Sequence, residues 1–431
     1  MNKNYRTTAY FLAAIAYAGF LTGCFFRPSP STPEEQAEKA GEFIAKGGYS
    51  PKRLYEIDSI HETWRHDGQA VEISMLAPKT SGRYPLIVYL PGLGEHADGG
   101  RLWRETWAKA GYAVFSVQPI EIGEALKELA PMPGDDKQSG GGDEDSWFSS
   151  SKDKDKSASL KAVRNSDLRY LGHEYFSQET LKKRMNHVLW AYAQLRQRTK
   201  AGQGLFAAAD WSRMVIAGYD IGAQTTAAMI GEKFDTDLPQ APDFKPLAAI
   251  LLSPAVDMAL GDVTTRYQNI SIPLLVVTGT EDDDPYAITT PYVRTAIWEY
   301  APSGNKYLLL LKKGGHQLLA GSNLSHRQES SPSQEDNEKT GRGDDMPRFA
   351  NSYRGGGGRS GGSAGGSPGG MGRSGHGGRH DDEQDFKHIA AVFSISTAFL
   401  DSVSKSDKAA QLWMAEDANQ WLTKSVHLKI K

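Results

Sequence analysis

Asp220 stands at the centre of a Gly-x-Asp-x-Gly pattern, where an apolar segment meets a stretch of small residues. Residues 213–217 predict a buried strand and residues 222–231 a helix, so Asp220 occupies the sharp turn between them. Gly218 and Gly222, two positions to either side, let the strand and the helix pass closely. A carboxylate presented on such a turn can act as a nucleophile or as a general base.

Two further candidate residues, Asp282 and His316, follow Asp220 along the chain. With Asp220 they give the order nucleophile, acid, base. Asp282 ends a Gly-Thr-Glu-Asp run after the apolar segment 274–278, and His316 ends a Gly-Gly-His run after segment 307–311. In a parallel sheet, the loops at the carboxyl ends of the strands lie along one edge. The sequence therefore predicts one site in which the three side chains meet.

Backbone N–H groups beside this site are candidates for an oxyanion hole. Leu93 lies in Leu-Pro-Gly-Leu-Gly-Glu-His, directly after an apolar segment, and Ile221 follows Asp220. We expect their N–H groups to point at a developing oxyanion. His96 and His187 have no motif around them, and we expect structural or surface roles for both.

Each of the three side chains also has a simpler interpretation. Asp220 could be a helix N-cap that accepts backbone N–H bonds, because its position is a helix N-terminus. Asp282 stands in an acidic run and could be a solvated turn carboxylate, while His316 could be a loop histidine. Asp257 is the second candidate for the acid, because it follows the strand before the one that leads to Asp282.

The wider chain predicts an α/β fold in which short apolar strands alternate with helices. This alternation is typical of a mostly parallel sheet that helices cover on both faces. We expect strands over residues 71–76, 85–90, 113–117, 213–217, 247–252, 274–278 and 307–311. We expect helices over residues 34–46, 101–110, 178–197, 222–231, 286–300, 386–403 and 408–423.

The N-terminus has the features of an export signal. A basic start precedes the apolar run 8–20, which leads to Leu-Thr-Gly and then Cys24. This motif resembles the bacterial lipobox, so residues 1–23 are predicted to be a lipoprotein signal peptide and Cys24 the lipidated residue. Phe25, where Asp would retain the protein in the inner membrane, favours the outer membrane, facing the periplasm or the cell surface. Residues 24–50 are expected to form the lipid-anchored tether.

Two stretches depart sharply from globular composition. Residues 134–158 and 321–383 are rich in Gly, Ser and charged residues and hold few apolar side chains. They lack the hydrophobic surface that offsets ordering entropy, so we expect disordered insertions. The alternative for the Arg/Gly-rich insertion, residues 321–383, is that it binds a cell-wall polyanion. The remaining segments, 51–320 and 384–431, are expected to form one domain, the second supplying its C-terminal helices.

Composition limits the partners. The formal net charge is −3 over 431 residues, so the bulk charge gives no sign of a nucleic-acid partner. Cys24 is the only cysteine, which excludes an intramolecular disulfide and leaves stability to the core. A membrane partner is expected through the lipid anchor.

Residues 84–316 and 386–422 resemble the α/β-hydrolase superfamily. The resemblance is strongest to the group of predicted dienelactone hydrolases, platelet-activating-factor acetylhydrolases and cutinase-like polyester hydrolases. Four stretches are similar to that group's PLVVFLHGxG, DxSRIGVxGHSxGG, PxLIIxGxxD and GxxH segments, namely residues 85–94, 210–226, 272–282 and 312–316.

This resemblance implies hydrolysis of an ester-type substrate by a Ser-His-Asp triad, with no cofactor and no metal ion. The implied substrate is a small-molecule or lipid ester, dienelactone-like or acetyl ester-like. Carried over by position, Asp220 takes the place of the nucleophile, His316 that of the base and Asp282 that of the acid. Leu93 and Ile221 take the positions of the oxyanion hole.

The departure from that group is at the nucleophile, where the group has Ser or Cys and this chain has Asp220. Asp there resembles the haloalkane dehalogenases and epoxide hydrolases, whose carboxylate attacks an sp³ carbon and forms an alkyl-enzyme ester. The halide-binding tryptophan that commonly follows is replaced by Ile221. Epoxide hydrolases carry a cap domain with tyrosines between the strands that correspond here to residues 247–252 and 274–278. Only about twenty residues separate these two strands, too few for such a cap. Residues 118–197, which include Tyr170 and Tyr175, are the alternative cover.

Several functional hypotheses follow from these patterns. The first is a membrane-anchored hydrolase of ester-type substrates that acts through Asp220 or through a water positioned by it. The alternatives are an Asp-nucleophile hydrolase of epoxide or carbon–halogen bonds, and a catalytically inactive protein that binds an ester-like or lipidic ligand. The last hypothesis is a surface-anchored interaction protein that binds a partner through its two disordered insertions.

Overall fold

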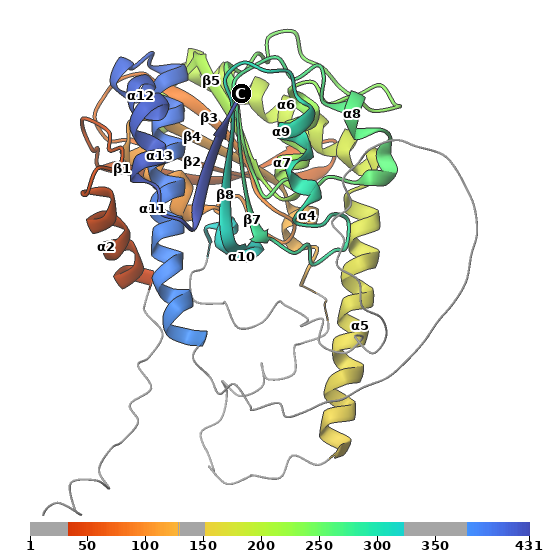
Figure 1. The fold of residues 1–431 in the computed structure, drawn as a ribbon. Helices are drawn as coiled ribbons and strands as arrows, with labels where there is room; N and C mark the ends of the chain where they lie inside the picture. Colours follow the sequence, from red (N-terminus) through yellow and green to blue (C-terminus); the bar gives the residue numbers. More distant parts are fainter. Residues whose placement is uncertain (1–32, 128, 130–150, 323–376) are drawn as a thin grey trace, which may run out of the picture.

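A mixed sheet of nine strands organises the part of the chain that the computed structural model describes, residues 33–127, 129, 151–322 and 377–431 (Figure 1). The strand order is β1-β2-β4-β3-β5-β6-β7-β8-β9. The strands are β1 (Ile57–His66), β2 (Gln69–Pro78), β3 (Tyr84–Leu90), β4 (Ala113–Pro119), β5 (Ala209–Tyr219), β6 (Ala248–Leu252), β7 (Leu274–Glu281), β8 (Lys306–Gly315) and β9 (Val426–Ile430).

The six strands from β4 to β8 in this order run parallel, while β1, β2 and β9 pair antiparallel at the two edges. After β3, the chain places β4 on one side of it and then crosses to place β5 on the other side. Strands β6 to β9 follow on the side of β5. The loops after β3 and β5 therefore leave the sheet side by side, at the kind of switch point where open α/β sheets bind ligands. Leu93 and Asp220 stand in these two loops.

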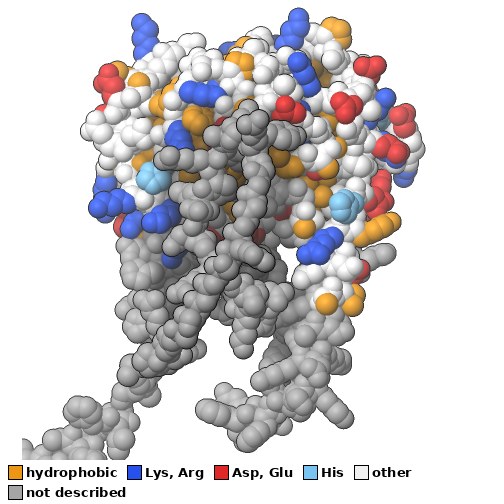
Figure 2. All heavy atoms as spheres, turned by 45° about the vertical axis from the view of Figure 1, so that its right-hand side comes forward, with side chains coloured by type: hydrophobic (Ala, Val, Ile, Leu, Met, Phe, Trp, Pro, Cys, Tyr) orange, Lys and Arg blue, Asp and Glu red, His pale blue; other side chains and the backbone are white. Residues whose placement is uncertain are grey.

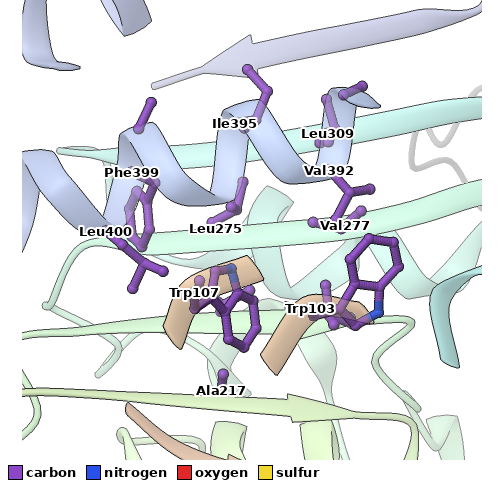
Figure 3. Packing of buried hydrophobic residues seen from close by; sticks show 14 of the residues in the cluster. Trp103, Trp107, Ala217, Leu275, Val277, Leu309, Val392, Ile395, Phe399 and Leu400 are labelled. Carbon is purple, nitrogen blue, oxygen red and sulfur yellow. The ribbon is translucent and has the colours of Figure 1, made fainter. Parts of the chain in front are cut away.

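One face of the sheet is covered by α2 (Pro33–Ile44), α3 (Arg101–Lys109), α11 (Gly377–Ser404), α12 (Lys408–Leu412) and α13 (Ala418–Trp421). Successive side chains of a strand point to opposite faces, so every second strand residue meets these helices. Figure 3 shows α11 lying across the strands beside the tryptophans of α3. The buried residues labelled there are Trp103, Trp107, Ala217, Leu275, Val277, Leu309, Val392, Ile395, Phe399 and Leu400.

The opposite face is covered by α6 (Gln178–Lys200), α7 (Ile221–Met229), α8 (Val263–Arg266) and α9 (Ala296–Tyr300). In Figure 1 these helices lie to the right of the sheet, and α2, α11, α12 and α13 lie to its left. The other α-helices of the described residues are α4 (Ile120–Glu124), α5 (Ser151–Tyr175) and α10 (His316–Ala320). The layered arrangement confirms the predicted α/β class, with a mostly parallel sheet between helices.

Two helices begin inside segments for which disorder was expected, whereas α2 matches the helix predicted over residues 34–46. Helix α5 begins at Ser151, within the stretch 134–158, and α11 begins at Gly377, within the stretch 321–383. Both helices continue well beyond the low-complexity stretches, and adding a turn to an existing helix avoids the cost of nucleation. Helix α2 lies within the predicted tether, yet the Phe43 ring packs 5.0 Å from that of Trp421.

The helix predicted over 286–300 is wrong in its first half. Helical structure covers only a 3₁₀ turn, Val293–Thr295, and α9. The Asp284 carboxylate accepts the backbone N–H groups of Tyr286, Ile288 and Thr289 instead, and this fixes a loop. The last predicted helix, 408–423, is likewise interrupted by a π-turn, Trp413–Asp417, between α12 and α13. Strands β1 and β9 had not been predicted.

Several predicted features lie outside the described residues. They are the signal peptide, Cys24, and most of both low-complexity insertions. Within the described ranges, no helix is long and apolar enough to cross a membrane. Figure 2 shows acidic and basic side chains interspersed over one face, as the near-neutral net charge of −3 leads one to expect.

Candidate active site

Asp220 occupies a strained turn between β5 and α7. Its backbone has φ 52° and ψ −116°, a region that L side chains seldom adopt. The flanking glycines make the turn possible: a Cβ on Gly222 would stand 2.0 Å from the carbonyl oxygen of Leu90, and one on Gly218 would stand 2.3 Å from that of Gly222. The Asp220 N–H donates to the Leu252 carbonyl at 3.1 Å, which ties the turn to the end of β6.

The two oxygens of the Asp220 carboxylate have different surroundings. The residue is 1 % exposed. Oδ2 accepts the Leu93 backbone N–H at 3.2 Å. Oδ1 has no hydrogen-bond partner among the described residues and lies 3.9 Å from His316 Nε2. The side chain makes no N-cap bond to α7, so the N-cap interpretation of Asp220 is wrong.

His316 is held from its other ring nitrogen. Its Nδ1 lies 2.8 Å from Asp282 Oδ1 and 2.8 Å from the hydroxyl oxygen of Ser253. The Ser253 hydroxyl donates to the same Asp282 oxygen at 2.6 Å, and Thr278 donates to the other one at 2.7 Å. Asp282 is fully buried, so it is not a solvated turn carboxylate. This bonding fixes the imidazole with Nε2 toward Asp220 and makes a simple loop role for His316 wrong.

Arg294 surrounds the Asp282 end of the site with positive charge. Its buried guanidinium donates to the backbone carbonyls of Ser253, Pro254 and Asp282 at 2.9–3.0 Å, and Nε lies 3.3 Å from Asp282 Oδ1. Burial alone raises the pKa of Asp282, but Arg294, His316 and the Ser253 hydroxyl outweigh it and lower that pKa to about 2. Asp282 is therefore ionised at neutral pH and can stabilise a protonated imidazole.

Asp220 and Glu95 are shifted in the opposite direction. Burial raises the pKa of Asp220, and the nearby His316 only partly opposes this. Desolvation likewise raises the pKa of Glu95, which lies close enough to interact with both Asp220 and His316. Glu95 accepts the Gly92 N–H at 2.9 Å and the Ser322 hydroxyl at 2.5 Å. These bonds brace the loop that carries the Leu93 N–H.

An apolar cluster lies over the carboxylate. Its buried members are Leu93, Ile122, Tyr175, Phe176, Ile221, Ala255 and Tyr286. Its aromatic members come from the end of α5 and from the loop after β7, and the rings of Phe176 and Tyr286 lie 5.6 Å apart. The Tyr286 hydroxyl reaches the Leu93 carbonyl at 3.4 Å. This cover uses Tyr175 from the expected region 118–197, whereas Tyr170 is 69 % exposed.

Arg184 of α6 joins this cover to α7. Its guanidinium donates to the Tyr175 carbonyl at 2.5 Å, to Gln224 Oε1 at 2.6 Å and to the Thr225 hydroxyl at 2.9 Å. Burial lowers the pKa of Arg184 to about 9, with Asp220 opposing that shift. The cation is still charged at neutral pH, so it adds positive potential behind Asp220.

The structure thus brings together five of the residues singled out from the sequence, Leu93, Asp220, Ile221, Asp282 and His316. The second candidate acid, Asp257, instead caps a 3₁₀ turn by accepting the Ala259 N–H at 2.8 Å. His96 pairs with Glu72 at 3.0 Å, and His187 is buried against His66, in line with structural roles.

Ser253, Thr278, Tyr286 and Arg294 were not found from the sequence. Ser253 follows an apolar strand directly and has φ 48°, so its position after β6 was the one available signal. The other three have no local motif, because their roles depend on contacts between distant segments.

Within the described residues, no group of three or more His, Cys, Asp or Glu side chains is arranged to hold a metal ion. No protein-family model matches this chain, and no curated protein matches it in sequence.

Proposed function

We propose that this chain is an α/β-hydrolase-fold enzyme that cleaves a bond at an electrophilic sp³ carbon, with Asp220 as the nucleophile. The strand order and the switch point between β3 and β5 support the finer fold assignment. So does the order of Asp220, Asp282 and His316 along the chain, each at the end of a parallel strand or in the loop that follows it.

One observation carries the proposal, the different surroundings of the two Asp220 oxygens. Oδ2 already lies against the Leu93 N–H, while Oδ1 is buried and unpaired on the side of His316. A carboxylate that has lost its hydration around one oxygen is a better nucleophile there than it is in water. The N–H group beside Oδ2 would stabilise the charge that gathers on this oxygen later in the reaction.

The proposed reaction has two steps. In the first, a lone pair of Asp220 Oδ1 forms a bond to the substrate carbon, and the leaving group departs with the electrons of the broken bond. In the second, His316 Nε2 takes a proton from water, and the water oxygen attacks Asp220 Cγ. Oδ2 then holds the negative charge beside the Leu93 N–H. Collapse breaks the bond to the alkyl oxygen, which takes the proton from His316, and the second water proton is lost to solvent.

Ester-type substrates, which the family resemblance favours, fit this geometry less well. The Leu93 N–H that would receive a substrate's carbonyl oxygen is bound to Asp220 itself. Attack of a carboxylate on an acyl carbon would also give an anhydride, which is costly to form. Ester hydrolysis by a water that Asp220 activates as a base remains the second candidate, favoured by the raised pKa of Asp220, which burial causes.

A substrate panel tests the proposal. The full chain, purified in detergent, would be assayed on a terminal epoxide, a haloalkane and a short p-nitrophenyl ester, beside Asp220→Asn and Asp220→Ser. We expect the wild type to turn over the epoxide or the haloalkane, and Asp220→Asn to be inactive. Turnover of the ester alone would favour the second candidate. An inert wild type, with esterase activity gained in Asp220→Ser, would show a ligand-binding protein in place of an enzyme.

We also propose that the chain is an outer-membrane lipoprotein, anchored through Cys24. The support is the Leu-Thr-Gly-Cys motif behind an apolar run. Cells fed a labelled fatty acid should label the wild type and leave Cys24→Ala unlabelled. Label on Cys24→Ala, or fractionation of the wild type with the inner membrane, would contradict this assignment.

A further inference from the structure

A pair of histidines stands away from the candidate active site, where the β1–β2 hairpin meets α6. His66 ends β1, and His187 lies in the middle of α6. Their Nδ1 atoms are 3.1 Å apart. The two-residue turn after His66, Asp67-Gly68, has φ values of 52° and 79°, as expected of a tight hairpin turn. The turn holds His66 in a fixed position opposite His187.

The second nitrogen of each ring shows where its proton lies. His187 Nε2 is 2.8 Å from Gln69 Oε1, an oxygen that can only accept, so Nε2 carries the hydrogen. His66 Nε2 lies 3.6 Å from the Asp67 carboxylate, beyond hydrogen-bond distance, and the negative charge there favours a hydrogen on Nε2. If Nε2 carries the hydrogen in both neutral rings, both Nδ1 atoms present lone pairs. A hydrogen bond across their 3.1 Å contact instead requires the proton of one ring on Nδ1.

Two lone pairs at this distance repel unless a cation lies between them. Imidazole nitrogens bind zinc at about 2.0–2.1 Å, so two of them on one ion stand roughly 2.9–3.4 Å apart for bond angles near 90–110°. The observed 3.1 Å falls within this range. A ligating histidine also commonly donates its other N–H to a carbonyl or a carboxylate. His187 does so through Gln69, whereas His66 Nε2 only lies 3.6 Å from the Asp67 carboxylate.

We propose that His66 and His187 bind one divalent transition-metal ion of the zinc, nickel or copper type through their Nδ1 atoms. Imidazole suits these ions, whereas magnesium and calcium prefer oxygen ligands. The His66 side chain is 17 % exposed, so water can reach the ion and fill its remaining positions. Trp190 stacks on the His66 ring at 4.6 Å and fixes its plane.

Such an ion would tie the hairpin to α6. His187 stands one helical turn after Arg184, whose guanidinium holds the cover over Asp220. The inferred metal lies outside the proposed catalytic groups, and its binding does not depend on the proposed reaction.

Metal titration of the full-length protein tests this inference. After chelator treatment and dialysis, Zn²⁺ would be added while binding is followed by calorimetry and Tm by circular dichroism. We expect saturable binding of one ion by these two side chains and a Tm that rises with Zn²⁺, because the ion binds the folded state. His66→Ala and His187→Gln should each weaken this binding by about tenfold or more. His61→Ala, on the exposed side of the same strand, should leave it unchanged.

A spectroscopic measurement separates this site from other histidines of the chain. With Cu²⁺ as the probe, the electron paramagnetic resonance spectrum of the wild type should show two nitrogen ligands, and that of His66→Ala one fewer. If His187→Gln does not fold, His66→Ala and His66→Gln carry the test. Equal affinity in wild type and the His66 variants, or no saturable binding of Zn²⁺ or Cu²⁺, would overturn the inference.

Discussion

Asp220 Oδ1 lies 3.9 Å from His316 Nε2, and it has no hydrogen-bond partner among the described residues. A direct hydrogen bond between a carboxylate and a histidine is shorter than this, so the two groups face each other without being joined. The relationship suits a carboxylate that must react first and a base that must activate water afterwards. It depends on the turn that presents Asp220 and on the residues that hold His316.

Gly222→Ala tests the turn. The new Cβ would stand 2.0 Å from the Leu90 carbonyl oxygen, which is backbone and cannot turn away as a side chain does. We expect the free energy of unfolding, measured with urea, to fall by about 3 kcal/mol or more. Gly41→Ala, where a Cβ meets no atom within 4 Å and lies in α2, is the matched control and should raise stability by up to about 1 kcal/mol. Equal effects of the two changes would contradict the account of the turn.

Arg294→Met tests the charge beside the triad acid. It leaves Asp282 buried without its cation, which should cost about 3–5 kcal/mol of unfolding free energy at pH 7. In the wild type, the Asp282 pKa of about 2 lies below the unfolded value, so its stabilisation is present above about pH 4 and is lost as the pH falls toward 2. Arg294→Met should not show this loss of unfolding free energy at acid pH, because the cation that lowers the Asp282 pKa is gone.

The control for this charge is Arg213→Met, which removes a partly exposed ion pair with Asp210 and should cost less than about 1 kcal/mol. Adding Asp282→Asn to Arg294→Met should recover part of the loss, because no unpaired charge then remains buried. A double variant as unstable as Arg294→Met alone would show that the guanidinium acts mainly through its bonds to backbone carbonyls.

Asp220→Asn tests the burial of the nucleophile. The folded-state pKa of Asp220 is raised by burial above its unfolded value, so Asp220 binds a proton more strongly in the folded chain than in the unfolded chain. Its contribution to stability is therefore fully present below about pH 4 and is lost as the pH rises through the folded pKa. The stability advantage of Asp220→Asn over the wild type, measured with urea, should grow between pH 4 and pH 8. An advantage that shrinks over this range would contradict the assigned shift.

Tyr286→Phe tests which leaving group the site serves. The Tyr286 hydroxyl is buried in the cover and, among the described residues, donates only one long bond, to the Leu93 carbonyl at 3.4 Å, so it can turn from there to protonate a leaving oxygen. Turnover of an epoxide should fall by about 10²- to 10⁴-fold, while a haloalkane, whose halide leaves unprotonated, should react as before. Tyr292→Phe, at a residue that is 71 % exposed, should change neither rate. A loss shared by both substrates would indicate a packing role.

The parts of the fold that could be predicted are those with strong local patterns. The parallel strands are buried on both faces and so appear as continuous apolar runs, whereas β1 and β9 are edge strands that mix exposed and buried residues. Residues 286–292 have the apolar spacing of a helix, and the prediction followed that spacing. In the structure the Asp284 carboxylate accepts three backbone N–H groups and holds a loop instead, a contact that apolar spacing does not reveal.

The same distinction applies to the site. Asp220, Asp282 and His316 could be located because each ends a strand-to-loop pattern with glycines. Ser253 and Arg294 reach the same imidazole from segments with no such pattern, at 2.8 Å and 3.4 Å from its Nδ1. Their contribution depends on the sheet bringing β6 and the segment before α9 together, which no short stretch of sequence records.

A single-turnover reaction in ¹⁸O-labelled water tests the central claim most directly. Enzyme in excess over an epoxide or haloalkane substrate would be quenched after one turnover, digested, and the peptide that contains Asp220 weighed. If Asp220 Oδ1 attacks carbon and water attacks Cγ, the label must enter the Asp220 carboxylate and the product must carry unlabelled oxygen. His316→Gln should stop at the ester intermediate, seen as the mass of the alkyl group of a haloalkane, or of the whole epoxide, added to that peptide. Label found in the product alone, with Asp220 unlabelled and no adduct in His316→Gln, would contradict nucleophilic attack by Asp220.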